Sequence, residues 1–307
     1  MLVLEQMATF FVLVLIGLVA NKRGIINADN ERQLSALLVD IACPAMIMSS
    51  VADGAKRMPS QEILLTLLAV ALVFGLTLAL ANILPVLLRY PKRKRCAVNA
   101  MTTFTNMGFI GMPLLAGLYG NEALIYITLF LIPSNIIYYT YGIHTINGNN
   151  PTANRFRWRD CLSSGVIACI IAIILYVTET TMPRLAAEPI KLLGAVTAPL
   201  AMMLLGASLS QINCSDFVKD WRLLAFIFIR MILFPVLVLI LLEQFVTSYM
   251  LLGACLVVLA TPIGNMVAML AALYDREVLP LIVRSTSMTT AASVLTVPLV
   301  AYLAGLG

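Results

Sequence analysis

Apolar residues in this chain gather in ten long stretches that are separated by short polar segments. A helix that crosses a bilayer needs about 20 mostly apolar residues, and each stretch is close to that length. The pattern therefore predicts an all-α membrane protein with ten transmembrane helices. The predicted helices cover residues 3–21, 33–52, 62–88, 96–118, 121–144, 161–179, 190–211, 219–243, 247–273 and 277–304.

The two halves of the chain resemble each other at a fixed offset. Pro44 and Pro199 lie in similar segments, as do Tyr119 and Tyr274, and each pair is 155 residues apart. Each half holds five predicted helices, and an odd number of crossings makes the second half enter the membrane from the opposite side. The sequence thus predicts an inverted repeat, a feature typical of secondary transporters. The predicted units are residues 1–145 and 161–307, with a polar linker over 146–160.

Composition supports a membrane protein and argues against an enzyme. Hydrophobic residues make up 61% of the chain and charged residues 11%, against about 25% charged residues in soluble domains. We therefore expect the lipid bilayer to be the solvent of this chain. The six cysteines show no metal-ligand spacing, and the single histidine forms no known catalytic motif. We expect no enzymatic activity, no cofactor and no metal site.

Lysine and arginine are distributed unevenly between the two sets of loops. Loops on one predicted side hold 14 of them, whereas the opposite side holds four: Lys56, Arg57, Arg184 and Lys191. Because basic residues accumulate on the cytoplasmic side, both termini are predicted to be extracytoplasmic, in a multi-pass plasma (inner) membrane protein. We interpret the basic residues, including the run 89–95, as topology anchors and not as a nucleic-acid site. The 14 are Lys22, Arg23, Arg32, Arg89, Lys92, Arg93, Lys94, Arg95, Arg155, Arg157, Arg159, Lys219, Arg222 and Arg276.

Two of the predicted helices contain helix-breaking residues near their middle. The helix over 96–118 contains Gly108, Gly111 and Pro113, and the helix over 247–273 contains Pro262 and Gly264. Glycine loosens a helix, whereas proline removes a hydrogen-bond donor and clashes with the preceding turn. We therefore predict that Pro113 and Pro262 mark breaks in helices four and nine.

Polar side chains accompany both predicted breaks. By helical rise, Asn106 lies about 15 Å from one membrane face, and Thr261, its mate at the offset of 155, about 21 Å from the other. Broken helices that enter from opposite sides would bring their N-terminal ends together, and such ends attract anions. Asn135 is a further candidate, although an interhelical hydrogen bond would explain it equally well. The candidate substrate-binding residues are Asn106, Thr105, Gly108, Asn135, Thr261, Gly264 and Asn265.

Three ionisable residues fall at membrane depth: Asp40, Arg230 and Arg284. Each costs at least a few kcal/mol there unless it is paired or wetted. One acid against two bases leaves the interior positive, which favours an anionic substrate. We hypothesise that Arg284 supports the site, and that Asp40 pairs in some states with a cation, Arg230 being an alternative partner. A purely structural ion pair remains open.

Several segments together resemble the auxin efflux carrier family. They are GLVANKRG at residues 17–24, Pro44-Ala45-Met46, TNMGFIGMP at residues 105–113, and Leu118-Tyr119-Gly120. The resemblance covers nearly the whole chain, and the segment over 105–113 is its most specific part. It implies transport of a small organic anion, a carboxylate such as malate, malonate or an auxin-like acid, by alternating access.

The resemblance also implies an architecture, the inverted-repeat fold of bile-acid symporters and sodium–proton antiporters. Predicted helices one, two, six and seven would form a scaffold, through which a homodimer could assemble. Helices three to five and eight to ten would form a transport domain, in which broken helices four and nine cross. Asn106 matches the family residue that contacts the substrate carboxylate, and Arg284 would lie beside the crossing. An ion-coupled symporter or exchanger of another solute class, or a channel or sensor on the same fold, is the alternative.

Overall fold

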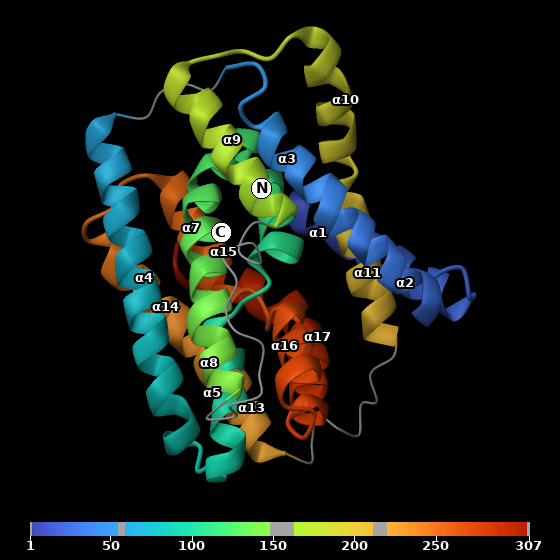
Figure 1. Ribbon diagram of the computed structural model, residues 1–307, viewed down its shortest axis with the longest axis vertical. Coiled ribbons are helices and arrows are strands. Elements are labelled where there is room, and N and C mark those ends of the chain that lie inside the picture. Colours follow the sequence, from blue (N-terminus) through green and yellow to red (C-terminus); the bar gives the residue numbers. More distant parts are fainter. Residues whose placement is uncertain (1, 55–58, 148–162, 211–219, 306–307) are drawn as a thin grey trace.

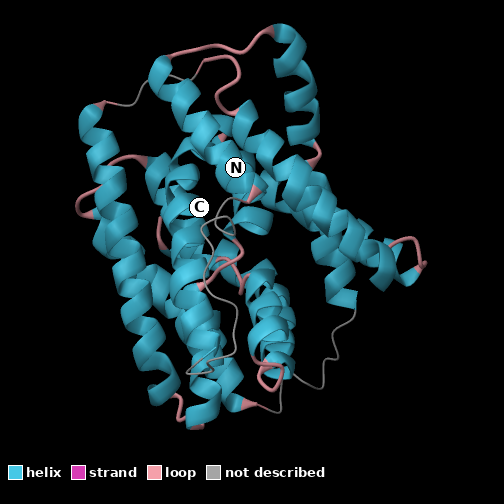
Figure 2. Ribbon diagram, in the orientation of Figure 1, coloured by secondary structure: helices cyan, strands magenta, loops and turns pink. Residues whose placement is uncertain are grey.

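The computed structural model describes residues 2–54, 59–147, 163–210 and 220–305, and these residues are helical apart from short connections and one isolated β-bridge (Figure 2). Most of the predicted linker and several predicted topology residues (Lys56, Arg57, Arg155, Arg157, Arg159 and Lys219) lie outside them. The α-helices are α1 Leu2–Lys22, α2 Ala28–Leu37, α3 Cys43–Ser49, α4 Ser60–Leu87, α5 Arg95–Thr103, α6 Met112–Tyr119, α7 Leu124–Ile137, α8 Ile143–Asn147, α9 Ser164–Thr178, α10 Arg184–Ala195, α11 Thr197–Ser210, α13 Trp221–Phe228, α14 Phe234–Glu243, α15 Tyr249–Ala260, α16 Asn265–Tyr274 and α17 Leu279–Leu303.

Five continuous helical stretches are long and apolar enough to cross a membrane. They are Ser60–Leu87, Asn121–Asn147, Arg184–Ser210, Trp221–Glu243 and Leu279–Leu303. Shorter apolar helices make up the rest of the described bundle. The outer faces of the long helices carry large apolar side chains that are more than half exposed, such as Leu64, Leu68 and Ile83 of α4. Lipid is the solvent that suits such faces, in agreement with the predicted membrane protein.

Two helices begin earlier than the hydrophobic pattern predicted. The predicted helix over 33–52 begins at Ala28, because the side chains of Asn27 and Asn30 each accept a hydrogen bond from the other's backbone N–H and so cap its first turn. The predicted helix over 190–211 begins at Arg184, directly after Pro183. The first extension is mostly polar and the second contains Arg184 and Glu188, so an apolar window does not include them.

Wide π-helical turns allow three prolines to stay inside helices. The turns Leu38–Ala42, Met107–Gly111 and Ile229–Leu233 each end two residues before a proline: Pro44, Pro113 and Pro235. Proline lacks the N–H of the usual helical bond, and its ring crowds the carbonyl four residues earlier. A wider turn relieves both conflicts. The prediction that Pro113 breaks helix four is therefore wrong, since helix continues past it to Tyr119.

A first group of helices consists of α1–α3 and α9–α11, and most of it lies on the right of the molecule in Figure 1. There α1 packs along α11, and α3 packs against α9 and α10. The α1–α11 contact is backbone on backbone, since a Cβ added at Gly17 would lie 1.9 Å from the Met203 carbonyl oxygen. A Cβ at Gly206 would lie 1.9 Å from the Val14 carbonyl oxygen. Such close approach through small residues is how helices associate in lipid.

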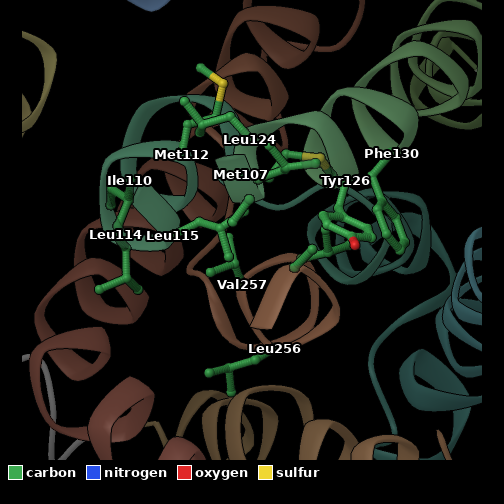
Figure 3. Close-up of a cluster of buried hydrophobic side chains, with 14 of the residues drawn as sticks. Met107, Ile110, Met112, Leu114, Leu115, Leu124, Tyr126, Phe130, Leu256 and Val257 are labelled. Carbon is green, nitrogen blue, oxygen red and sulfur yellow. The ribbon is translucent and has the colours of Figure 1, made fainter. Parts of the chain in front are cut away.

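The second group is arranged around α15, whose residues 251–260 are all buried. The neighbours of α15 are α6, α7, α14 and α17, while α4 packs on α5. Figure 3 shows Val257 of α15 against the segment that carries Met107 and Leu115, and Leu256 on the opposite side of the helix. A central helix with no polar face, itself part of the second broken helix, thus packs against the broken segment of the first half.

Candidate functional site

The two broken helices cross at their breaks. The first break, residues 104–106, separates α5 from the segment that begins with the turn at Met107, and the second, residues 261–264, separates α15 from α16. An isolated antiparallel bridge joins Thr105 and Ile263. The Asn106 N–H donates to the Pro262 carbonyl at 2.8 Å, and the Gly264 N–H donates to the Phe104 carbonyl at 3.0 Å. Pro262 therefore lies in a true helix break, as predicted, and the crossing satisfies backbone groups that lipid could not.

These two hydrogen bonds give a register that differs from the sequence offset. Asn106 and Gly264 occupy equivalent positions, because each donates its N–H to a carbonyl of the other break and each is the N-cap of the helical segment that follows. The two residues are 158 positions apart (264 − 106). The expectation that Thr261 is the counterpart of Asn106 is therefore wrong. The second break has one residue more than the first, and the first segment restarts with a π-helical turn. The segment Met107–Tyr119 is three residues longer than Asn265–Tyr274, so the offset returns to 155 where Tyr119 and Tyr274 end their helices.

Gly264 allows the two backbones to approach this closely. A Cβ at Gly264 would lie 3.0 Å from the carbonyl oxygen of Thr105 and 3.3 Å from its carbonyl carbon. A third helix supports the crossing, because the hydroxyl of Thr289 on α17 accepts a hydrogen bond from the Ile263 N–H at 3.3 Å. The crossing is therefore tightly packed and admits no larger residue at position 264 without a shift of the chain.

A cavity of about 90 Å³ lies beside the crossing, between the two helix groups. Asn106 and Asn265 line it, and both stand at the start of a helical segment, where free N–H groups point outward. From the other group, α2 supplies Glu31 and α11 supplies Ser208, and the Glu31 carboxylate accepts a hydrogen bond from the Ser208 hydroxyl at 2.7 Å. The full lining is Glu31, Ser35, Asn106, Phe109, Ile110, Leu204, Leu205, Ser208, Asn265, Thr286, Ser287 and Thr290.

Two of the seven predicted substrate-binding residues, Asn106 and Asn265, line this cavity. Asn106 is only 9% exposed. Thr105 and Gly264 form the crossing itself, and Thr261 is buried with its hydroxyl bonded to the Val257 carbonyl at 2.7 Å. None of these three is part of the cavity wall.

The other two predicted residues lie outside the cavity wall as well. The amide of Asn135 donates to the Leu131 carbonyl of its own helix at 2.8 Å. It therefore neither lines the cavity nor forms the interhelical hydrogen bond that was the alternative. A Cβ added at Gly108 would meet no atom within 4 Å, and its carbonyl accepts a hydrogen bond from the Cys43 thiol at 3.6 Å. Gly108 therefore faces open space next to α3 and is not part of the cavity wall.

The sequence reasoning missed the hydroxyl groups of α17. Thr286 is 9% exposed, lines the cavity, and its hydroxyl has no hydrogen-bond partner among the described residues. A buried polar group without a partner is costly, and the Thr286 hydroxyl is such a group next to the cavity. The signal was present in the sequence, since Ser285, Thr286, Thr289 and Thr290 recur at helical spacing along one face of α17.

Arg230 lies at the other side of the crossing. Its side chain, on the π-helical turn between α13 and α14, is 2% exposed. Its Nε donates to the Thr102 carbonyl at 2.8 Å, and its Nη1 donates to the Leu259 carbonyl. These carbonyls belong to the last turns of α5 and α15, so one guanidinium group contacts the C-terminal ends of both broken helices.

Arg284 and Asp40 do not lie where the sequence analysis expected. Arg284 Nη1 is 3.9 Å from Oδ2 of Asp220, the N-cap of α13. Tyr90 and Arg222 lie nearby, at the end of the molecule that carries residues 89–95 and is called here the arginine-rich end. Burial, reinforced by Asp220, raises the pKa of Tyr90 to about 12. Asp40 is exposed and accepts a hydrogen bond from Ser164 at 3.1 Å. No Asp40–Arg230 ion pair forms, because Arg230 turns to backbone carbonyls instead.

Comparison with known proteins identifies the family. The model of a family described as membrane transport protein matches residues 2–155 and 152–303, which together cover nearly the whole chain. The chain belongs to the membrane transport protein family. This confirms the resemblance to auxin efflux carriers.

The chain is also similar to an uncharacterized transporter of Methanocaldococcus jannaschii. It is 26% identical to this chain over 309 residues, which cover 97% of this chain and 98% of the relative. As a member of the membrane transport protein family, the chain is a transport protein and not an enzyme, as predicted. The crossing and its cavity are therefore the candidate site for the transported solute.

Proposed function

We propose that the protein is a secondary active transporter of small organic anions that works by alternating access. The observation that carries this proposal is the composition of the cavity beside the crossing. Two helical segments begin there, at Asn106 and Asn265, and Thr286 is a further polar residue of the same wall. Helix N-terminal ends carry roughly half a positive charge each, so a carboxylate is the ligand that they suit best.

The proposed transport cycle rests on the location of this cavity. We propose ten membrane crossings in two inverted repeats, with a scaffold of α1–α3 and α9–α11 and a transport domain of α4–α8 and α13–α17. The described stretches and the two matched segments of the family model are consistent with this division. The cavity takes Glu31, Ser35 and Ser208 from the proposed scaffold and the rest of its polar wall from the proposed transport domain. Movement of one group against the other would carry the bound anion across the membrane.

The test is uptake of radiolabelled malate, malonate and indole-type acids into proteoliposomes that hold the purified protein. We expect saturable uptake of at least one carboxylate and no uptake of its neutral amide. Asn106→Ala should weaken binding by about 1–3 kcal/mol, the cost of an unpaired buried group. Asn135→Ala is the matched control and should leave affinity unchanged, because Asn135 bonds to its own helix. Equal uptake of acid and amide would contradict the proposal.

Glu31 supports a second candidate, in which a cation is coupled to transport. Its carboxylate is the one ionisable group in the cavity wall formed by the described residues, and it would repel a bound anion. A proton or metal cation that enters with the substrate would remove this repulsion. If the cation is a proton, Glu31→Gln should keep uptake in the absence of a pH gradient and lose its stimulation by an inward proton gradient. An unchanged gradient response would exclude Glu31 as the coupling group.

We also propose that the end of the molecule with residues 89–95 faces the cytoplasm. Lys92 and Glu122 are exposed and lie in the connections that follow α4 and α6. In a background without other thiols, Glu122→Cys should react with a membrane-impermeant maleimide in intact cells, and Lys92→Cys should react only after permeabilisation. The reverse labelling pattern would overturn the orientation.

A further inference from the structure

Arg230 is buried inside a membrane-spanning helix, where a charged side chain costs the most free energy. It is 2% exposed, in the middle of the span Trp221–Glu243, and its ring neighbour is Phe234 with the guanidinium carbon 6.0 Å from the ring centre. Within the part of the chain that the structure describes, no ion pair joins it to a carboxylate. An intramembrane arginine costs at least a few kcal/mol unless other groups compensate its charge.

The compensating groups are the ends of the two broken helices. The last carbonyls of a helix have no partner within it, and those of Thr102 and Leu259 belong to this set. Both accept hydrogen bonds from the same guanidinium group. A helix C-terminal end carries roughly half a negative charge, so two such ends together carry about one, and this matches the single charge of arginine.

The space around this contact is closed. It is bounded by Met101, Thr105, Phe226, Thr261 and Thr289, among others, and leaves no room for a water molecule beside the guanidinium. A free ion therefore cannot share the position with Arg230. The opposite, N-terminal ends at the crossing face the cavity with Asn106 and Asn265, and the Glu31 carboxylate lies in the wall of the same cavity.

We propose that Arg230 is a tethered cation that occupies a cation site formed by the C-terminal ends of α5 and α15. It holds the crossing together and makes a mobile cation unnecessary at this position. The planar guanidinium suits the role because its donors are set in a fixed fork, which reaches two carbonyls on different helices. This inference concerns the stability and ion requirement of the crossing and does not rest on the identity of the substrate.

The test is chemical rescue of Arg230→Ala, measured as the thermal unfolding midpoint of the purified protein in detergent. Loss of two charge-assisted hydrogen bonds should lower the midpoint by about 5–10 °C. Addition of methylguanidinium at millimolar concentration should restore a large part of this loss in a saturable way, with choline at equal ionic strength as the reference. The wild-type midpoint should not rise under the same conditions, because its site is already filled.

Three further variants separate charge from packing. Arg230→Met fills the space without charge, so it should be destabilised and should not respond to methylguanidinium. Arg230→Lys should keep part of the stability, which preserves the test if the alanine variant fails to fold. Arg222→Ala, on the same helix but at the arginine-rich end, should show no rescue. A methionine variant as stable as wild type, or an alanine variant without rescue, would overturn the proposal.

Discussion

Replacing Asn106 by aspartate is expected to abolish binding of the anionic substrate. Asn106 is the N-cap of the helical segment from Met107 and lines the cavity, where it is 9% exposed. An aspartate there would place a carboxylate at the helix N-terminal ends and mimic the substrate's own charged group. Like charges in contact cost several kcal/mol, so we expect affinity to fall by at least 100-fold. Calorimetric titration with the substrate found by uptake would measure this loss.

The matched control for Asn106→Asp is Asn106→Ala, which removes the same amide without adding charge. The alanine variant should lose less affinity than the aspartate variant. Both variants should elute from a size-exclusion column at the same volume as the wild-type protein. If the two variants bind equally well, the added charge does not face the substrate, and the anion site lies elsewhere.

Replacing Gly206 by leucine is expected to prevent stable folding. The first side-chain carbon at this position would lie 1.9 Å from the Val14 carbonyl oxygen and 2.9 Å from the Leu18 nitrogen. Both atoms belong to the backbone of α1, so no side-chain rotation can relieve the clash. Separation of α1 from α11 would also undo the packing of the buried residues between them. We expect the thermal midpoint to fall by more than about 10 °C, or the protein to be lost during purification.

Gly75→Leu is the matched control for Gly206→Leu. Gly75 is also inside a long helix, α4, but a Cβ there would meet no atom within 4 Å. The exposed position suits an apolar side chain in lipid, so the midpoint should stay within a few degrees of wild type. Similar destabilisation by both substitutions would mean that the α1–α11 contact has no special role.

The polar residues of the site show the limit of sequence reasoning. Asn106 and Asn265 were predicted because helix breakers lie next to them, and both line the cavity. Asn135 was predicted on polarity and depth alone, yet it bonds to its own helix. A side chain at membrane depth can satisfy itself locally or across a contact, and its own sequence neighbourhood does not distinguish the two cases. Glu31 and Ser208 were missed for the same reason, since 177 residues separate them in the chain.

The sequence alone determined that this chain is an all-helical membrane transport protein with a helix break at Pro262. These properties are local, because apolar length and a missing N–H act within one helix. The tertiary structure alone decided the register of the crossing and the partners of the buried charges. Every helix ends in free carbonyls, so only packing could select α5 and α15 as the pair that Arg230 joins, while Arg284 pairs with Asp220. The physical reason is that dipole ends and charges compensate each other across space, at distances that the order of residues does not encode.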